Sequence, residues 1–181
     1  MEPIYGITGM PLAGKTLVAE IMKEQGYSVL DMGDVVRKEM EKEEISAGKE
    51  ASFVGEKREN MGMDAIAQLS IPYLKDLTEN TDKIIITGMR GWSEKKRFEK
   101  EMKRDIEVVA VWASRETRRK RKEARQRDED VKGQKFHERD LREIRNGMGK
   151  LIALSDHIIV NNEITIEELR EKIKKFVEGA K

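Results

Sequence analysis

Cysteine is absent from the 181 residues of the chain, and histidine occurs only twice, at His137 and His157. A disulfide framework, a cysteine nucleophile and thiolate zinc sites are therefore excluded, and a site built from several histidines is disfavoured. No apolar run approaches the ~20 residues that span a bilayer, and residues 1–4 have no secretory-signal character. We therefore expect a cytoplasmic protein with no membrane partner.

Net charge is also nearly absent, although charged residues are abundant. The chain has 36 Lys and Arg against 35 Asp and Glu, for a net charge of +1, while 39% of its residues are charged. Disorder usually needs a large net charge or a shortage of apolar residues, and here 38% of the residues are hydrophobic and fall in compact blocks. With no repeat or linker, residues 1–181 are expected to form a single domain.

Two hydrophobic periods alternate along the chain. Short apolar blocks of the length of buried parallel strands lie at residues 4–8, 28–30, 83–87, 107–112 and 157–160. Helical stripes lie between them, including a long one over residues 63–77, where Pro72 should kink or break the helix. This order predicts an α/β fold, a three-layer α/β/α sandwich around a five-stranded parallel sheet.

The strongest motif is Gly-Met-Pro-Leu-Ala-Gly-Lys-Thr at residues 9–16, which fits G-x-x-x-x-G-K-(S/T) between a strand and an amphipathic helix. Its glycines let backbone N–H groups surround a polyphosphate at the helix N-terminus. Lys15 should reach the β- and γ-phosphates, and the Thr16 hydroxyl should ligate Mg²⁺. ATP and Mg²⁺ are thus the expected ligands, with nucleotide contacts from Gly9, Met10, Pro11, Leu12, Ala13, Gly14, Lys15, Thr16 and Leu17.

Segments after the other strands carry a family resemblance. Residues 31–37 (DMGDVVR) resemble the Gly-Asp-x-x-Arg segment of nucleoside monophosphate kinases, and residues 84–90 (IIITGMR) resemble their third-strand segment. Residues 156–169 are similar to the last strand and adenine loop of dephospho-CoA kinases. In order and spacing, the whole chain resembles a largely archaeal group of adenylate-kinase-related, dephospho-CoA-kinase-like P-loop proteins.

The resemblance implies a division of the chain and a set of nucleotide contacts. It implies a core over residues 1–37, 78–119 and 146–181, an acceptor-binding insertion over 38–77 and a lid over 120–145. It places Asn161 in the adenine loop and Arg121 and Arg125 on the ATP phosphates, where they would assist catalysis with Lys15. The returning half of the lid would add Arg139 and Arg142 to the substrate site.

On the acceptor side, the candidates are one carboxylate and two arginines. Asp34 is the expected catalytic carboxylate, which takes a hydroxyl proton or binds Mg²⁺ through water, and its alternative role is to cap the following helix. Arg37 and Arg90 are expected to bind the acceptor phosphate, with exposed ion pairs as the alternative.

One position departs from the family pattern and leaves two functions open. Thr87 stands where the family has a carboxylate that organises the Mg²⁺ shell, and threonine cannot supply that charge. The first function is a kinase that phosphorylates a nucleotide-like acceptor, a nucleoside monophosphate or a dephospho-CoA-like molecule. The alternative is a nucleotide-binding sensor or switch with weak or no turnover.

A basic run follows the fourth strand. Within residues 115–127, eight of thirteen residues are Lys or Arg and two are Glu, a local balance of +6. Nucleic acid is a poor candidate partner because the run has no interleaved aromatics and the rest of the chain is slightly acidic. A localised clamp for phosphates is the expected use, and no pattern predicts an oligomeric state.

Overall fold

The computed structural model describes residues 3–125 and 136–179. Its centre is a parallel sheet in the order β2-β3-β1-β4-β5. The strands are β1 (Ile4–Thr8), β2 (Ser28–Asp31), β3 (Ile84–Thr87), β4 (Ile106–Trp112) and β5 (His157–Val160). The predicted five-stranded α/β fold is confirmed, and no observed strand end differs by more than one residue from the prediction.

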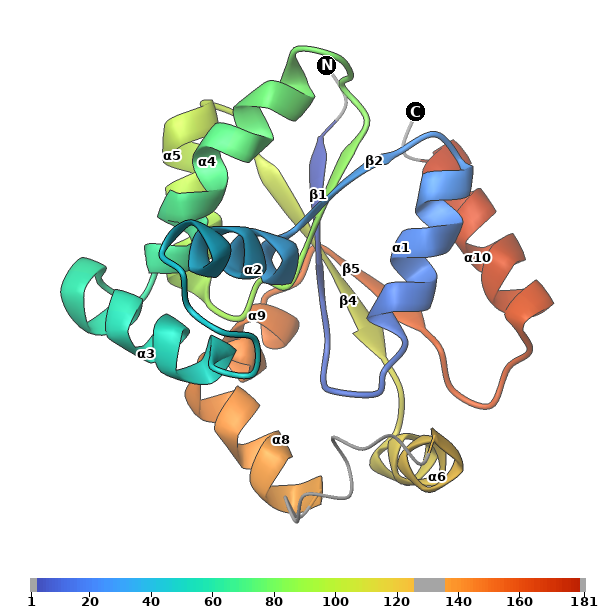
Figure 1. The fold of residues 1–181 in the computed structure, drawn as a ribbon. Coiled ribbons are helices and arrows are strands. Elements are labelled where there is room, and N and C mark those ends of the chain that lie inside the picture. Colours follow the sequence, from blue (N-terminus) through green and yellow to red (C-terminus); the bar gives the residue numbers. More distant parts are fainter. Residues whose placement is uncertain (1–2, 126–135, 180–181) are drawn as a thin grey trace.

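Helices cover both faces of the sheet (Figure 1). They are α1 (Lys15–Glu24), α2 (Met32–Lys42), α3 (Glu50–Met61), α4 (Ala65–Thr78), α5 (Trp92–Met102), α6 (Arg115–Arg125), α8 (Phe136–Arg145), α9 (Met148–Ala153) and α10 (Ile166–Gly179). Helices α1 and α10 pack together on one face, and α2, α4, α5 and α9 lie on the other. This is the three-layer sandwich that the alternating periods predict.

Strand periodicity builds two cores, one on each face of the sheet. All three isoleucines of β3 are fully buried, yet Ile84 and Ile86 pack in the core under α4 and α5, and Ile85 packs under α1 and α10. Because successive strand residues point to opposite faces, an uninterrupted apolar run is what a strand covered on both sides requires.

Helix α4 decides between the two effects predicted for Pro72 only in part, by excluding a break. It continues through Pro72 without a break. Ile66 and Leu74, on either side of the proline, are buried in the same core, and this packing compensates for the backbone hydrogen bond that proline cannot donate. Within the predicted insertion 38–77, α4 is therefore packed as part of the core layer. Helix α3 is tied to α5 through an ion pair between the partly buried Arg58 and the buried Glu94.

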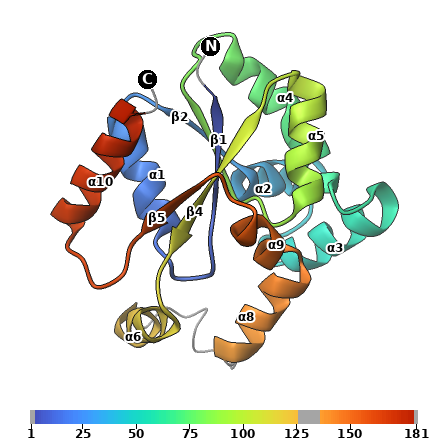
Figure 2. The same cartoon turned by 180° about the vertical axis from the view of Figure 1, so that it is seen from behind.

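The loop of residues 9–16 leaves β1 at the carboxyl edge of the sheet, between β3 and β4. Ligands of open parallel sheets bind where neighbouring connections diverge in this way. Helices α6 and α8 lie beyond this edge in both views (Figures 1 and 2). The second half of α6 and all of α8 belong to the predicted lid, residues 120–145. Residues 126–135 of that lid lie outside the described part of the chain. Over residues 3–125 and 136–179, no helix combines the length and the apolarity needed to cross a bilayer.

Two isoleucines of α10 that differ in burial yield a stability prediction. Ile173 is fully buried, whereas Ile166 on the same helix is 52% exposed. We expect Ile173→Ala to lower the free energy of unfolding by about 2–5 kcal/mol, through lost apolar burial and the cavity that it leaves. The matched Ile166→Ala should cost well under about 1 kcal/mol. Equal losses in urea denaturation would contradict this packing of α10.

Candidate functional site

The loop of residues 9–16, called here the phosphate loop, is held in a conformation that needs its glycines. Gly9 and Gly14 have φ angles of 147° and 102°. A side chain at Gly9 would collide with the Val111 carbonyl, and one at Gly14 with the Asn161 amide. A turn closes between the Ala13 N–H and the Met10 carbonyl oxygen at 3.1 Å. The backbone is thus packed too closely against β4 and residue 161 to admit side chains.

Lys15, the first residue of α1, lies over this loop. Its Nζ donates to the carbonyl oxygens of Gly9, at 2.6 Å, and Met10, at 3.1 Å. Burial lowers the pKa of Lys15 to about 8. A buried ammonium group that is held by neutral carbonyls is poised to gain from an approaching anion.

Charged groups from three distant segments act on Lys15. Glu143 of α8 raises the pKa of Lys15, while Arg90, Arg139 and Arg118 lower it. These groups therefore lie within electrostatic reach of the Lys15 amine. Two of the predicted phosphate ligands, Arg90 and Arg139, are thus close enough to act electrostatically on Lys15.

Arg118 makes a buried connection between the predicted lid and the phosphate loop. Its two Nη atoms donate to the two Oδ atoms of Asp140 on α8, each at 2.8 Å, and Nη1 also donates to the Pro11 carbonyl oxygen at 3.2 Å. The guanidinium group lies over the Phe136 ring at 5.0 Å. A bidentate pair of this kind fixes the geometry of both helices.

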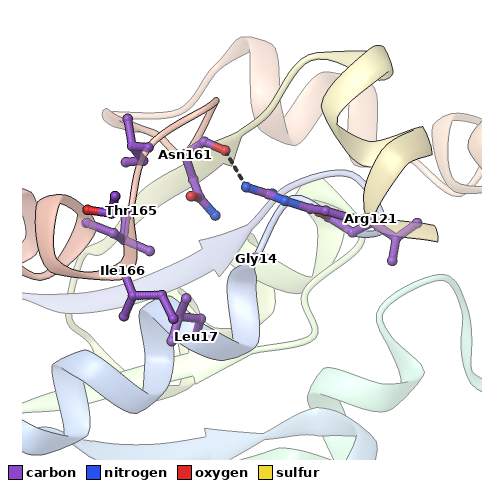
Figure 3. Close-up of a pocket in the computed structure, with 9 residues that line it drawn as sticks. Gly14, Leu17, Arg121, Asn161, Thr165 and Ile166 are labelled. Atoms are coloured by element: carbon purple, nitrogen blue, oxygen red, sulfur yellow. Dashed lines mark hydrogen bonds between the residues drawn. The ribbon is translucent and has the colours of Figure 1, made fainter. Parts of the chain in front are cut away.

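Arg121 and Asn161 meet on the other side of the loop (Figure 3). Arg121 donates from Nη1 to the carbonyl oxygens of Leu12 and Ala13, both at 3.1 Å, and from Nη2 to the Asn161 carbonyl oxygen at 2.9 Å. The Asn161 side chain donates to the Ala13 carbonyl oxygen at 2.8 Å. Two residues predicted from separate segments to bind nucleotide therefore contact the same turn.

A pocket of about 180 Å³ opens beside Gly14 (Figure 3). Five of its lining residues are aliphatic and three have polar side chains. The full lining consists of Leu12, Gly14, Leu17, Arg121, Asn161, Ile164, Thr165, Ile166 and Leu169. This volume is below the ~300–1,000 Å³ of pockets that enclose a whole drug-sized ligand. Aliphatic side chains and a neighbouring guanidinium group are chemically suited to a planar aromatic ring.

The carboxylates at the end of β2 have roles that differ from the prediction. Asp31, not Asp34, caps α2, because its Oδ1 accepts from the Asp34 N–H at 2.9 Å. The capping alternative for Asp34 is therefore wrong, since α2 begins at Met32 and Asp34 lies in its first turn. Asp34 instead pairs with Arg37, and both side chains are more than half exposed.

Thr87 is not isolated from negative charge. Asp31 and Thr87 are paired in register across β2 and β3, and the Thr87 hydroxyl donates to Asp31 Oδ2 at 2.6 Å. A carboxylate therefore lies at this edge of the sheet, on the strand next to the position where the family pattern has one.

A magnesium ion is compatible with the available oxygen donors. In the described part of the chain, no cluster of three or more His, Asp or Glu side chains could hold a metal unaided. Mg²⁺ in nucleotide sites is usually held by one or two protein oxygens together with phosphates and waters. The exposed Thr16 hydroxyl and the carboxylates of Asp31 and Asp34 supply donors of that chemistry.

The remaining predicted arginines divide into two groups. Arg90 Nη1 and Arg142 Nη2 both lie 3.6 Å from Glu143 Oε1, so these two are brought together. Arg37 pairs with Asp34 on α2 instead. The prediction for Arg125 concerns a side chain outside the described part of the chain.

Three of the charged groups at the phosphate loop were missed as site residues: Arg118, Asp140 and Glu143. On α8 the two acids are buried, whereas its aliphatic Leu141 and Ile144 are exposed, the reverse of the usual helix pattern. A sequence pattern could have indicated these residues. Arg118 and Arg121 are three residues apart, as are Asp140 and Glu143, so each pair lies on one face of its helix.

Comparisons with known proteins show the family and the fold of the chain. The profile of a family described as an AAA domain matches residues 8–135. A UPF0200 protein of Pyrococcus furiosus is 38% identical over 177 residues, which cover 94% of each chain. A UPF0200 protein of Methanococcus vannielii is 33% identical over 183 residues, which cover 96% of each.

Solved structures share the fold at low sequence identity. TT1252 from Thermus thermophilus matches with a TM-score of 0.65 at 19% identity, over 99% of this chain and 98% of that one. Shikimate kinase from Acinetobacter baumannii in complex with shikimate matches with a TM-score of 0.61 at 19% identity, over 100% of this chain and 96% of that one. The predicted P-loop kinase-like fold is thereby confirmed. The chain belongs to the UPF0200 family and has a P-loop domain of the family described as AAA.

Proposed function

We propose that this protein binds Mg-ATP and transfers its γ-phosphoryl group to a small, nucleotide-like acceptor. The observation that carries the proposal is the enclosure of Lys15. The amine of this partly buried lysine contacts the phosphate loop and feels the charges of Arg90, Arg118 and Arg139, and a pocket that we assign to a planar base opens next to the same loop. Phosphoryl transfer depends mainly on positioning and on neutralising phosphate charge, which is what such a cluster supplies.

The residues divide naturally between donor and acceptor. In our proposal, the base enters the pocket beside Arg121 and Asn161, and the phosphates replace the carbonyl oxygens that Lys15 now contacts. Mg²⁺, when bound through Thr16 and a carboxylate, would neutralise charge that develops on the β- and γ-phosphates. Arg90, Arg139 and Arg142 would bind an acceptor phosphate, and Asp34 would take a hydroxyl proton where the acceptor is an alcohol.

A nucleotide sensor with little turnover is the second candidate, and the exposed pair of Asp34 and Arg37 favours it. Both residues were assigned to the acceptor side, yet here they neutralise each other across the first two turns of α2. Thr87 also leaves β3 without the carboxylate of the family pattern. A sensor would bind ATP as tightly as a kinase but would form ADP slowly or not at all.

One assay separates these functions. The protein is incubated with Mg-ATP and a panel of nucleoside monophosphates and dephospho-CoA, and ADP formation is measured against Lys15→Ala. The kinase predicts that at least one acceptor raises ADP formation well above the ATP-only rate, and that Lys15→Ala removes the increase. ATP binding with no stimulation by any acceptor would favour the sensor instead.

Arg121 and Arg119 form a matched pair on α6 for testing the nucleotide site. Arg121 contacts the phosphate loop and the pocket, whereas Arg119 is exposed and pairs with Glu116 and Glu123. We expect Arg121→Ala to weaken ATP binding roughly tenfold or more, because charge-assisted phosphate contacts are strong. Arg119→Ala should leave ATP affinity within about twofold, because exposed ion pairs contribute little. Equal effects in calorimetric titrations would contradict this assignment.

The lowered pKa of Lys15 predicts a pH dependence of ATP binding. In the free protein this pKa is about 8, below its ordinary value of 10.5, because the amine is buried. A bound polyphosphate favours the charged amine and raises the pKa, so binding just above pH 8 should take up a proton, and affinity should fall as pH rises further. Titration calorimetry in buffers of different ionisation enthalpy measures this uptake. Lys15→Arg, which stays protonated, should remove it, and identical uptake in that variant would refute the explanation.

A further inference from the structure

Glu143 is a buried carboxylate whose hydrogen bonds are incomplete. The residue is 4% exposed. Its Oε1 lies 3.6 Å from Arg90 Nη1 and 3.6 Å from Arg142 Nη2. These distances are those of ion pairs and are too long for hydrogen bonds. Its Oε2 is buried and has no hydrogen-bond partner among the described residues. An unpaired buried polar atom is destabilising, so its retention calls for an explanation.

The position of this carboxylate suggests what its free oxygen does. Glu143 acts electrostatically on Lys15, together with Arg90 and Arg139, so it belongs to the charged group around the phosphate loop. An anion that approaches Arg90 and Arg142 would be attracted by them and repelled by Glu143. An ionised carboxylate oxygen can only accept hydrogen bonds. The repulsion is therefore relieved best by a ligand that carries a proton to Oε2.

We propose that Glu143 determines specificity on the acceptor side of the site, by admitting an anion only when it brings a hydrogen-bond donor. The ligand class is a phosphate group with its own O–H or with a neighbouring hydroxyl, as in a sugar phosphate or nucleotide. Arg90 and Arg142 bind the anionic oxygens, and Glu143 Oε2 accepts from the O–H. A fully deprotonated anion of the same shape and charge is rejected. The assignment of this cluster to the acceptor rests on the proposed function.

Hydrogen phosphate and sulfate are the probes, because they share a tetrahedral shape and a double negative charge, but only hydrogen phosphate has an O–H group. Dissociation constants for both are measured at constant ionic strength, slightly above neutral pH. The series is run in the Lys15→Ala background, so that the phosphate-loop lysine does not contribute. The parent is compared with Glu143→Gln and with Glu138→Gln, the same change at an exposed position of α8.

We expect the parent to bind hydrogen phosphate at least about tenfold more tightly than sulfate, a ratio equivalent to ~1.4 kcal/mol. Glu143→Gln should bind sulfate about tenfold more tightly than the parent does and lose the preference, because its amide donates to either anion. Glu143→Asp, which keeps the charge, should retain the preference, and so should Glu138→Gln. Equal affinities in the parent, or an unchanged ratio in Glu143→Gln, would overturn the proposal.

The anion ratios are measured separately from the proposed function, whose nucleotide-binding part is tested by ADP titration of the unmodified protein. Failure to bind ADP together with the expected anion ratios would remove the kinase proposal and leave the role of Glu143 intact. ADP binding together with equal anion affinities would do the opposite.

Discussion

The candidate site depends on the buried pair between Arg118 and Asp140. Two charges removed from water are tolerated only when they are well paired, and this pair is bidentate and also holds the Pro11 carbonyl of the phosphate loop. It therefore fixes α6 and α8 relative to β1. One helical turn beyond each member lies a residue that faces the site. Arg121 reaches the pocket beside Asn161, and Glu143 reaches Arg90.

Much of the fold could be predicted from residue order, because each buried strand is a short apolar run and the phosphate loop has a fixed spacing. Lys15, Arg121 and Asn161 were predicted to bind nucleotide, and all three contact the backbone of that loop. Burial of charged residues could not be predicted in the same way. Asp140 and Glu143 lie in a stretch that has the composition of a solvated helix, and only the tertiary contact with Arg118 and Arg90 explains why they are buried. Pro72 illustrates the same limit, because packing of α4 overrides a local preference.

The end of β2 shows how a shift of three residues changes a chemical interpretation. Asp34 follows a glycine and was the expected catalytic carboxylate, with a helix cap as its alternative role, yet Asp31 makes the capping bond and also accepts from Thr87. A carboxylate is therefore present beside β3 although β3 itself ends in threonine. The absence of an acid at position 87 is for this reason a weaker argument against catalysis than the sequence suggested.

Nearly balanced charge over the whole chain conceals a strongly charged edge of the sheet, where cations from α6, α8 and the loop after β3 act on one lysine. The central claim is that this edge holds a nucleotide. Its most direct test is a crystal structure of the protein grown with Mg-ADP. The account predicts the base in the pocket lined by Leu12, Leu17 and Ile164, with the β-phosphate against the backbone of the phosphate loop and Lys15. ADP bound elsewhere, or no bound ADP at saturating concentration, would contradict it.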